Sequence, residues 1–237
     1  MIRQVVLALQ FMTRLPLPAV RATEDDFVKS IRWFPLAGVV VGAAVAGPWW
    51  LGAKAGGDWG AALIGLIAWV AMTGALHLDG LGDIADAAGA AHKDRERLSA
   101  VLADPHIGSF GVVAIVLQLI AKLVLLHALV PGQVWALLLV PICARVGPLA
   151  WTLVLPPLHE GLGSRFRRAV GWPLVACWCI LAAAAGLLVA SPLLVLFLAM
   201  PIWGWWLQSR IGGISGDGHG AGIELVETAL LAALVLL

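Results

Sequence analysis

The sequence predicts an all-α fold, a polytopic bundle of transmembrane helices that forms a single domain over residues 1–237 with its N-terminus in the cytoplasm. The first observation is composition: 61% of the residues are hydrophobic and 12% are charged, whereas a soluble domain carries roughly a quarter charged residues. The second is a series of apolar runs long enough to cross a bilayer. The third is that positive charge gathers in alternate segments between these runs.

The apolar runs set the expected spans, and at ~20 residues each the chain accommodates about seven. One run is too long for a single helix and is expected to divide at Ser191-Pro192, because this pair favours a turn. The last run is short and gives only a marginal span. The runs cover residues 33–51, 59–78, 107–130, 133–156, 172–207 and 224–237.

The charge distribution orients these spans. Of the fifteen lysines and arginines, twelve lie in the arm 1–32 and in the segments 79–106, 158–171 and 208–223, which seven spans place on one face. The opposite face receives only Lys54, so the positive-inside rule places the N-terminus and these segments in the cytoplasm. A net charge of +1 predicts no nucleic-acid partner, whereas membrane lipid is an expected one.

The segment from His77 to Asp86 carries three aspartates directly after an apolar run. In a helix Asp79, Asp83 and Asp86 stand at i, i+4 and i+7, within about 60° of one another. Carboxylates this close repel unless a cation neutralises them, and oxygen ligands favour Mg²⁺. The alternative is a solvated helix start, where acidic residues are common. His77 either binds substrate or caps the preceding span.

The segment Asp104-Pro-His-Ile-Gly108-Ser-Phe-Gly111 leads into the third expected span. Asp104 adds a fourth carboxylate to the predicted metal ligands. Gly108 allows the backbone to approach a phosphate closely. The alternative is an ordinary turn, which Asp, Pro and Gly also favour.

Two positive charges fall inside expected spans, where they are costly and usually functional. Lys122 and Arg145 are predicted to neutralise a pyrophosphate, or else to form structural pairs with carboxylates. Lys122 lies fifteen residues beyond Ile107, or ~22 Å along a helix, which is deep for a residue at the membrane face. Arg14 is a further candidate, with a positive-inside anchor as its alternative.

The glycine-rich segment 212–222 is predicted to be a close-packed loop whose amides cradle a phosphate around Ser215 and Asp217. It lacks the Lys-Ser/Thr ending of a P-loop, and a flexible connector is the alternative. Residues 160–168 add glycines and arginines suited to an anionic substrate or to lipid headgroups. Acids, bases and glycine segments at one membrane face together indicate metal-dependent phosphoryl transfer.

With these motifs in this order, nearly the whole chain resembles the cobalamin synthase family, the adenosylcobinamide-GDP ribazoletransferases. The resemblance implies transfer of the corrinoid phosphate of adenosylcobinamide-GDP to α-ribazole or its 5′-phosphate, with release of GMP and with Mg²⁺ as cofactor. It also implies a multi-pass protein of the bacterial inner membrane whose active site faces the cytoplasm. The preferred nucleophile and any homo-oligomer stay open. The motifs are Thr13-Arg14-Leu-Pro16, Phe34-Pro35, 77–86, 104–111, Ala121-Lys122, Arg145, 160–163 and 212–227.

The expected site combines the residue chemistry with this resemblance. The chain departs from the family pattern at Pro105-His106, where Ser-Arg is usual, at Ala87, where glycine is usual, and at Ser215, where Thr is typical. None of these changes removes a proposed metal ligand. The expected residues are Asp79, Asp83, Lys122 and Arg145 in catalysis, Arg14, His77, Gly108, Ser215 and Asp217 in substrate binding, and Asp79, Asp83, Asp86 and Asp104 as metal ligands.

Two other functions compete with this interpretation. A CDP-alcohol phosphotransferase also uses an aspartate-rich helix at the membrane face, but its pattern requires Ala-Arg after the glycine, which does not follow Gly80. An anion permease would use Lys122 and Arg145 near the middle of the bilayer. The clustering of polar residues on one face favours an interfacial enzyme over a permease.

Overall fold

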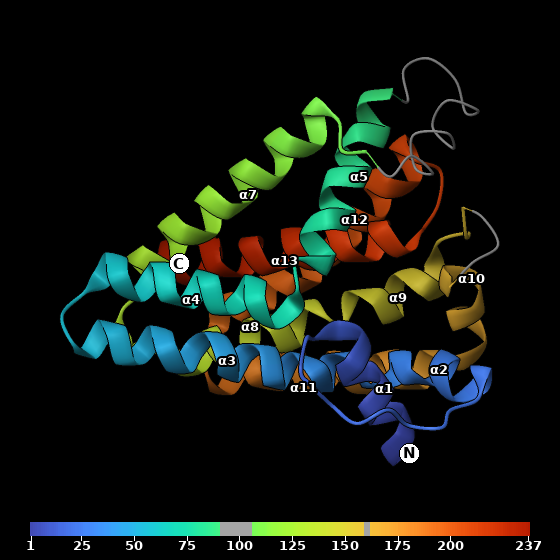
Figure 1. The fold of residues 1–237 in the computed structure, drawn as a ribbon, viewed down its shortest axis with the longest axis horizontal. Coiled ribbons are helices and arrows are strands. Elements are labelled where there is room, and N and C mark those ends of the chain that lie inside the picture. Colours follow the sequence, from blue (N-terminus) through green and yellow to red (C-terminus); the bar gives the residue numbers. More distant parts are fainter. Residues whose placement is uncertain (91–105, 159–161) are drawn as a thin grey trace.

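The computed structural model describes residues 1–90, 106–158 and 162–237, and every regular element within them is helical (Figure 1). The expected all-α bundle is therefore confirmed. The helices are α1 (Ile2–Met12), α2 (Glu24–Ser30), α3 (Phe34–Lys54), α4 (Asp58–Thr73), α5 (Leu76–Ala90), α7 (Ser109–Ala128), α8 (Val134–Ala144), α9 (Gly147–Val154), α10 (Leu162–Phe166), α11 (Trp172–Leu188), α12 (Leu196–Arg210) and α13 (Gly216–Leu236), joined in places by the short 3₁₀ turns η1 (Ile31–Trp33), η2 (Pro131–Gln133), η3 (Arg167–Ala169) and η4 (Ser191–Val195).

The apolar helices of the described residues agree with a polytopic membrane bundle. By length and composition, five helical segments in the described ranges are long and apolar enough to cross a membrane, and the bent pair α4–α5 makes a sixth if it counts as one span. Helix α11 has 17 residues and falls just short. The expected division at Ser191-Pro192 is confirmed, because α11 ends at Leu188 and η4 begins at Ser191.

Helix α13 corrects two expectations. The glycine-rich segment was expected to be a loop and the last span to begin at residue 224, but the helix already begins at Gly216 and runs for 21 residues. Its glycines serve close packing, since a Cβ at Gly220 would lie 3.3 Å from the Cα of His77 and one at Gly222 would lie 2.5 Å from the Trp151 ring. Helix α13 therefore lies buried among α5, α7, α8, α9 and α12.

Small residues also bring α3 against α8. Gly38 and Gly42 lie one turn apart on the same face of α3, and a Cβ at Gly42 would lie 2.1 Å from the carbonyl oxygen of Leu138. Such spacing of small residues is typical of helices that pack closely in membranes. The Trp49 indole nitrogen then donates to the carbonyl of Leu126 (2.9 Å), which joins α3 to the last turn of α7.

A sharp bend separates α4 from α5. Gly74 and Ala75 both have positive φ (61° and 59°), and the two helices meet at 84°. Figure 1 shows α3, α4 and α13 along the long axis of the molecule, while α5 rises steeply from the end of α4. The aspartate-bearing segment is therefore not a straight continuation of α4 but a separate helix that crosses the direction of the bundle.

The N-terminal arm packs against α3 and α10 and beside the α4–α5 bend. Phe11, Phe27, Phe34 and Phe166 form a cluster of rings with centroids 5.7 to 6.4 Å apart, which joins α1, α2, α3 and α10. The backbone amide of Arg14 donates to the carbonyl of Met72 (2.7 Å), so the arm is also attached next to the α4–α5 bend.

Candidate active site

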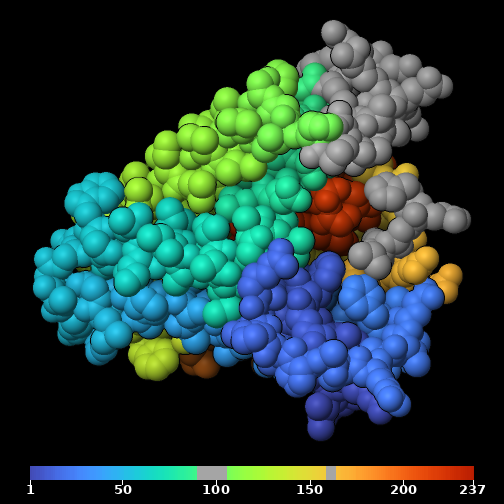
Figure 2. All heavy atoms as spheres, in the orientation of Figure 1, coloured from blue at the N-terminus to red at the C-terminus, as the bar shows by residue number. Residues whose placement is uncertain are grey.

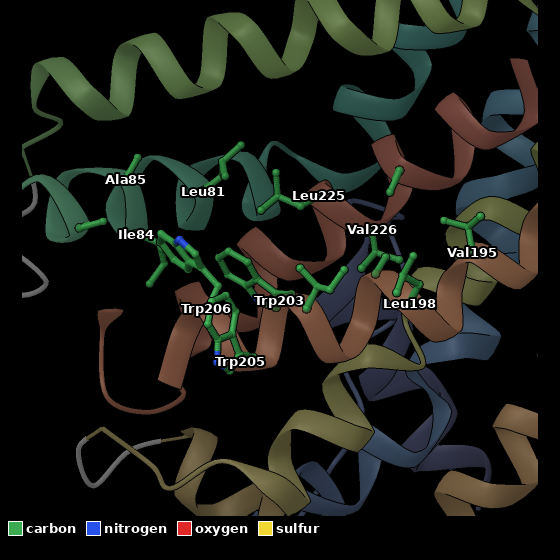
Figure 3. Close-up of a pocket in the computed structure, with 14 residues that line it drawn as sticks. Leu81, Ile84, Ala85, Val195, Leu198, Trp203, Trp205, Trp206, Leu225 and Val226 are labelled. Atoms are coloured by element: carbon green, nitrogen blue, oxygen red, sulfur yellow. The ribbon is translucent and has the colours of Figure 1, made fainter. Parts of the chain in front are cut away.

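Helix α5 separates acidic from apolar side chains around its circumference. Asp79 is exposed and Asp83 and Asp86 are half-buried, all on one side, as their spacing predicts. The opposite side lines an apolar pocket of about 610 Å³ between α5, α12 and α13 (Figure 3). Its α5 residues are Leu81, Ile84, Ala85 and Ala88. Because aliphatic and tryptophan side chains line this pocket, we place any phosphate chemistry on the acidic side of α5.

The beginning of α13 borders the acidic side. Gly80 of α5 faces Asp217 so closely that a Cβ at Gly80 would lie 2.9 Å from the Asp217 Cα. The half-buried Asp83 carboxylate is thus surrounded by the negative charges of Asp217, Asp79 and Asp86. The structure thus adds a carboxylate from a distant part of the sequence to the three on α5. Figure 2 shows red atoms of the C-terminal segment at the surface between the blue-green atoms of α4–α5 and the blue atoms of the N-terminal arm.

The beginning of α7 borders the acidic side from another direction. The Asp86 carboxylate accepts hydrogen bonds from the backbone amides of Gly108 (2.7 Å) and Gly111 (3.0 Å). Carboxylates stabilise a helix N-terminus because its first amides lack partners within the helix. The Gly108 amide, which was expected to approach a substrate phosphate, is thus bonded to Asp86. Asp86 fastens α7 to α5 in addition to any part it has in metal binding.

Ser215 and His77 are both buried and contact other residues of the protein. Ser215 is the N-cap of α13, and its hydroxyl accepts from the Gly218 amide (3.0 Å) and lies 3.4 Å from an Asp217 oxygen. His77 is buried, with its Nε2 atom 3.3 Å from the Met12 sulfur. Arg14 is exposed and lies over Gly74, beside the α4–α5 bend. Asp104 and Glu160 lie outside the described residues.

Lys122 and Arg145 pair with carboxylates of α13. The Lys122 ammonium lies 2.7 Å from Glu224 and 2.6 Å from Glu227, and 4.2 Å from the centroid of the Trp69 ring. The Arg145 guanidinium lies 2.8 Å from the other Glu227 oxygen and also donates to the Pro141 carbonyl (2.9 Å). Their hydrogen bonds and ion pairs thus lead to α13 and to the backbone of α8, not to the aspartates of α5.

Sequence reasoning did not assign roles to Glu224, Glu227 and Gln118. The Gln118 amide donates to a carboxylate oxygen of Glu224 (2.9 Å), so it joins the same buried group. The sequence contains one signal of this group. Glu224 and Glu227 interrupt an otherwise apolar run and follow Asp217 by seven and ten residues. Positions with that spacing share a helix face.

The acidic side has the donor chemistry that Mg²⁺ requires, since its ligands are carboxylate oxygens. Asp79, Asp83 and Asp217 are the residues whose charges a cation would neutralise. Over the described residues, no three His, Cys, Asp or Glu side chains lie in a group arranged to hold a metal. The agreement with Mg²⁺ is therefore in the type of ligand atom, and Asp104, the fourth expected ligand, lies outside the described part of the chain.

Comparisons with known proteins agree with the sequence motifs. The model of the cobalamin-5-phosphate synthase family matches residues 4–235. Proteins named adenosylcobinamide-GDP ribazoletransferase are 58% identical in Novosphingobium aromaticivorans (99% of this chain, 96% of that protein), 48% in Thiobacillus denitrificans (97% and 93%) and 33% in Brevibacillus brevis (96% and 96%). No solved structure matches the chain. From the family match and these full-length relatives, the chain belongs to the cobalamin-5-phosphate synthase family.

Proposed function

We propose that this protein transfers the corrinoid phosphate of adenosylcobinamide-GDP to α-ribazole or its 5′-phosphate and releases GMP. A hydroxyl oxygen of the ribazole loses its proton and forms a new bond to the phosphorus attached to the corrinoid. The bond from that phosphorus to the leaving oxygen of GMP breaks. Family membership over nearly the whole chain supports this reaction. We place the reaction at the acidic side of α5, because Asp217 and the beginning of α7 lie next to its aspartates.

In this proposal Asp79 and Asp83 would hold Mg²⁺, with Asp217 beside them and with Asp86 and Asp104 as further candidates. A bound ion would neutralise charge that builds up on the pyrophosphate oxygens. The carboxylates would keep the ion at one place on α5, because the helix fixes their spacing. Asp86 also holds the first turn of α7 against α5, which keeps two sides of the site together.

Direct contact of Lys122 and Arg145 with the pyrophosphate remains a prediction from the sequence. The Lys122 and Arg145 side chains are 3% and 0% exposed and are paired with glutamates, which favours an indirect role. Arg14 and His77 remain candidates at the junction of the arm with α5. The same holds for Ser215 at the start of α13.

We also propose that the protein resides in the bacterial inner membrane with its N-terminus and the acidic side of α5 in the cytoplasm. The bias of lysine and arginine toward the segments on that face supports this orientation. Both proposed substrates would then reach the site from the cytoplasm. Membrane lipid surrounds the apolar helices in this arrangement, and a homo-oligomer is compatible with it.

The test of this function is GMP release by membranes that contain the protein, supplied with adenosylcobinamide-GDP, α-ribazole and Mg²⁺. We expect stoichiometric formation of GMP and of the corrinoid–ribazole phosphodiester, and a parallel assay with α-ribazole 5′-phosphate identifies the preferred nucleophile. Release of CMP from a CDP-alcohol instead would support the phosphotransferase alternative. Substrate uptake without any bond cleavage would support a permease, and either result would overturn the proposal.

A further inference from the structure

A row of polar side chains runs down one face of α13 from the candidate site into the bundle. Asp217 lies at the N-terminal end of this row, and Glu224 and Glu227 follow seven and ten residues later. At 100° per residue these three positions fall within about 80° of one another. At 1.5 Å per residue Glu224 lies ~10 Å farther along the helix axis than Asp217. The N-terminal end of the row contacts Gly80 of α5, and the two glutamates contact residues of α7 and α8.

The two glutamates of this row form a buried group with two cations, Lys122 and Arg145. Lys122 bridges Glu224 and Glu227, and Arg145 pairs with Glu227. No side chain in the group is more than 3% exposed. The formal charges cancel, which is the condition under which ionised groups persist away from water. We call this group the buried quartet.

The quartet restricts where α13 can sit. A shift of α13 along or around its axis would separate both glutamates from Lys122 and Arg145, and leave charges unpaired among apolar side chains. Because an unpaired buried charge is strongly unfavourable, the paired arrangement fixes the register of α13 against α7 and α8. The α13 helix is continuous from Gly216, so the same register determines where Asp217 stands relative to α5.

We infer that Glu224 and Glu227 are positioning residues, which hold α13 through Lys122 and Arg145 so that Asp217 stands beside Asp83. This inference rests on the proposed function, because it gives Asp217 a task in the metal-dependent transfer. It also gives Lys122 and Arg145 a role that acts through α13, in addition to the contact with the pyrophosphate that the sequence predicts. The buried quartet thus fixes the position of Asp217 beside α5 from about two helical turns farther along α13.

Lys122 and Arg145 differ in how well their replacement can test whether the quartet positions Asp217. In the described part of the chain the Nε and Nη2 atoms of Arg145 have no hydrogen-bond partner, so Arg145 has donors to spare for a ligand. The Lys122 ammonium has two carboxylates and the Trp69 ring around it. Lys122 is therefore the better residue for separating support of α13 from contact with substrate.

The test removes charges one at a time and then as a matched pair. Glu224→Gln, Glu227→Gln and Lys122→Met each unbalance the quartet, whereas Lys122→Met combined with Glu224→Gln restores a neutral group. Each purified full-length variant is assayed for Mn²⁺ affinity by electron paramagnetic resonance, and for GMP release and the KM for Mg²⁺ per folded molecule. Glu24→Gln is the control, since Glu24 makes the same kind of pair with Arg165 at the surface, where its side chain is 67% exposed.

We expect the single variants to bind Mn²⁺ about tenfold to a hundredfold more weakly, the usual loss when a residue that orients metal ligands is changed. The double variant should recover most of that affinity and most of the GMP release, and Glu24→Gln should match the unmodified protein. If a single variant does not accumulate, the double variant still decides, because it keeps the charge balance.

Two results would overturn the inference. A double variant as inactive as Lys122→Met, with normal Mn²⁺ affinity, would show that Lys122 contacts the substrate. Single variants with normal metal affinity and normal turnover per folded molecule would show a role in folding alone. Failure of the proposed function can be told apart from failure of this inference. If the unmodified protein released no GMP, the Mn²⁺ affinities of the variants would still show whether the buried quartet positions Asp217.

Discussion

Gly80 of α5 and Asp217 of α13 meet so closely that a methyl group at residue 80 would overlap the backbone of residue 217. These residues are 137 positions apart in the sequence, and their contact brings a fourth carboxylate to the acidic side of α5. A glycine is required here because the contact is with backbone atoms, which cannot rotate away as a side chain can.

Gly80→Ala should therefore push α13 away from α5 and lower GMP release by about tenfold or more, even though alanine is favoured over glycine inside a helix by up to about 1 kcal/mol. The control is Gly47→Ala in α3, since a Cβ at Gly47 meets nothing within 4 Å. That variant should keep the unmodified rate and gain slightly in thermal stability. Equal rates for both variants would contradict the importance of the contact.

Asp86 and Asp79 should differ in how they affect stability. Asp86→Ala removes two hydrogen bonds from the N-terminus of α7 and should cost about 1–2 kcal/mol, as loss of a helix-capping side chain does. Asp79→Ala removes an exposed carboxylate and should leave the thermal unfolding midpoint in detergent unchanged while it abolishes turnover. The two midpoints decide this prediction, and an unchanged midpoint for Asp86→Ala would refute the anchoring role.

The orientation in the membrane can be tested at two exposed residues that end their helices. In a protein whose Cys143, Cys177 and Cys179 are replaced, Arg210→Cys should react with an impermeant maleimide only from the cytoplasmic side. Lys54→Cys, at the end of α3, should react only from the periplasmic side. The reverse pattern would invert the topology and place the start of α13 in the periplasm.

Much of the fold could be predicted from local patterns. Hydropathy located the spans because lipid demands long apolar helices, and the spacing of Asp79, Asp83 and Asp86 placed them on one side of α5. The start of α13 was mispredicted because glycine has a low helix propensity. In the folded chain close packing of Gly220 on His77 and of Gly222 on Trp151 outweighs that propensity.

The partners of the buried charges could not be predicted in the same way. Lys122 and Glu227 are 105 residues apart, and Arg145 and Glu227 are 82 residues apart. Sequence spacing shows which residues share a helix face, but it does not show which faces of different helices meet. For the same reason the phenylalanine cluster that attaches α1 and α2 to α10 left no signal in the sequence.

If the acidic side of α5 carries out metal-dependent release of GMP, as we propose, then Asp83 is the residue whose replacement tests this most directly. GMP release is measured as a function of Mg²⁺ concentration for Asp83→Asn and, as the control, for Asp58→Asn at the exposed start of α4, with each protein quantified in the membrane. We predict that Asp83→Asn loses about 10²-fold or more in turnover, the scale of losing one charge-stabilising group, while Asp58→Asn is unaffected. An Asp83→Asn protein that works at the unmodified rate under limiting Mg²⁺ would contradict the claim.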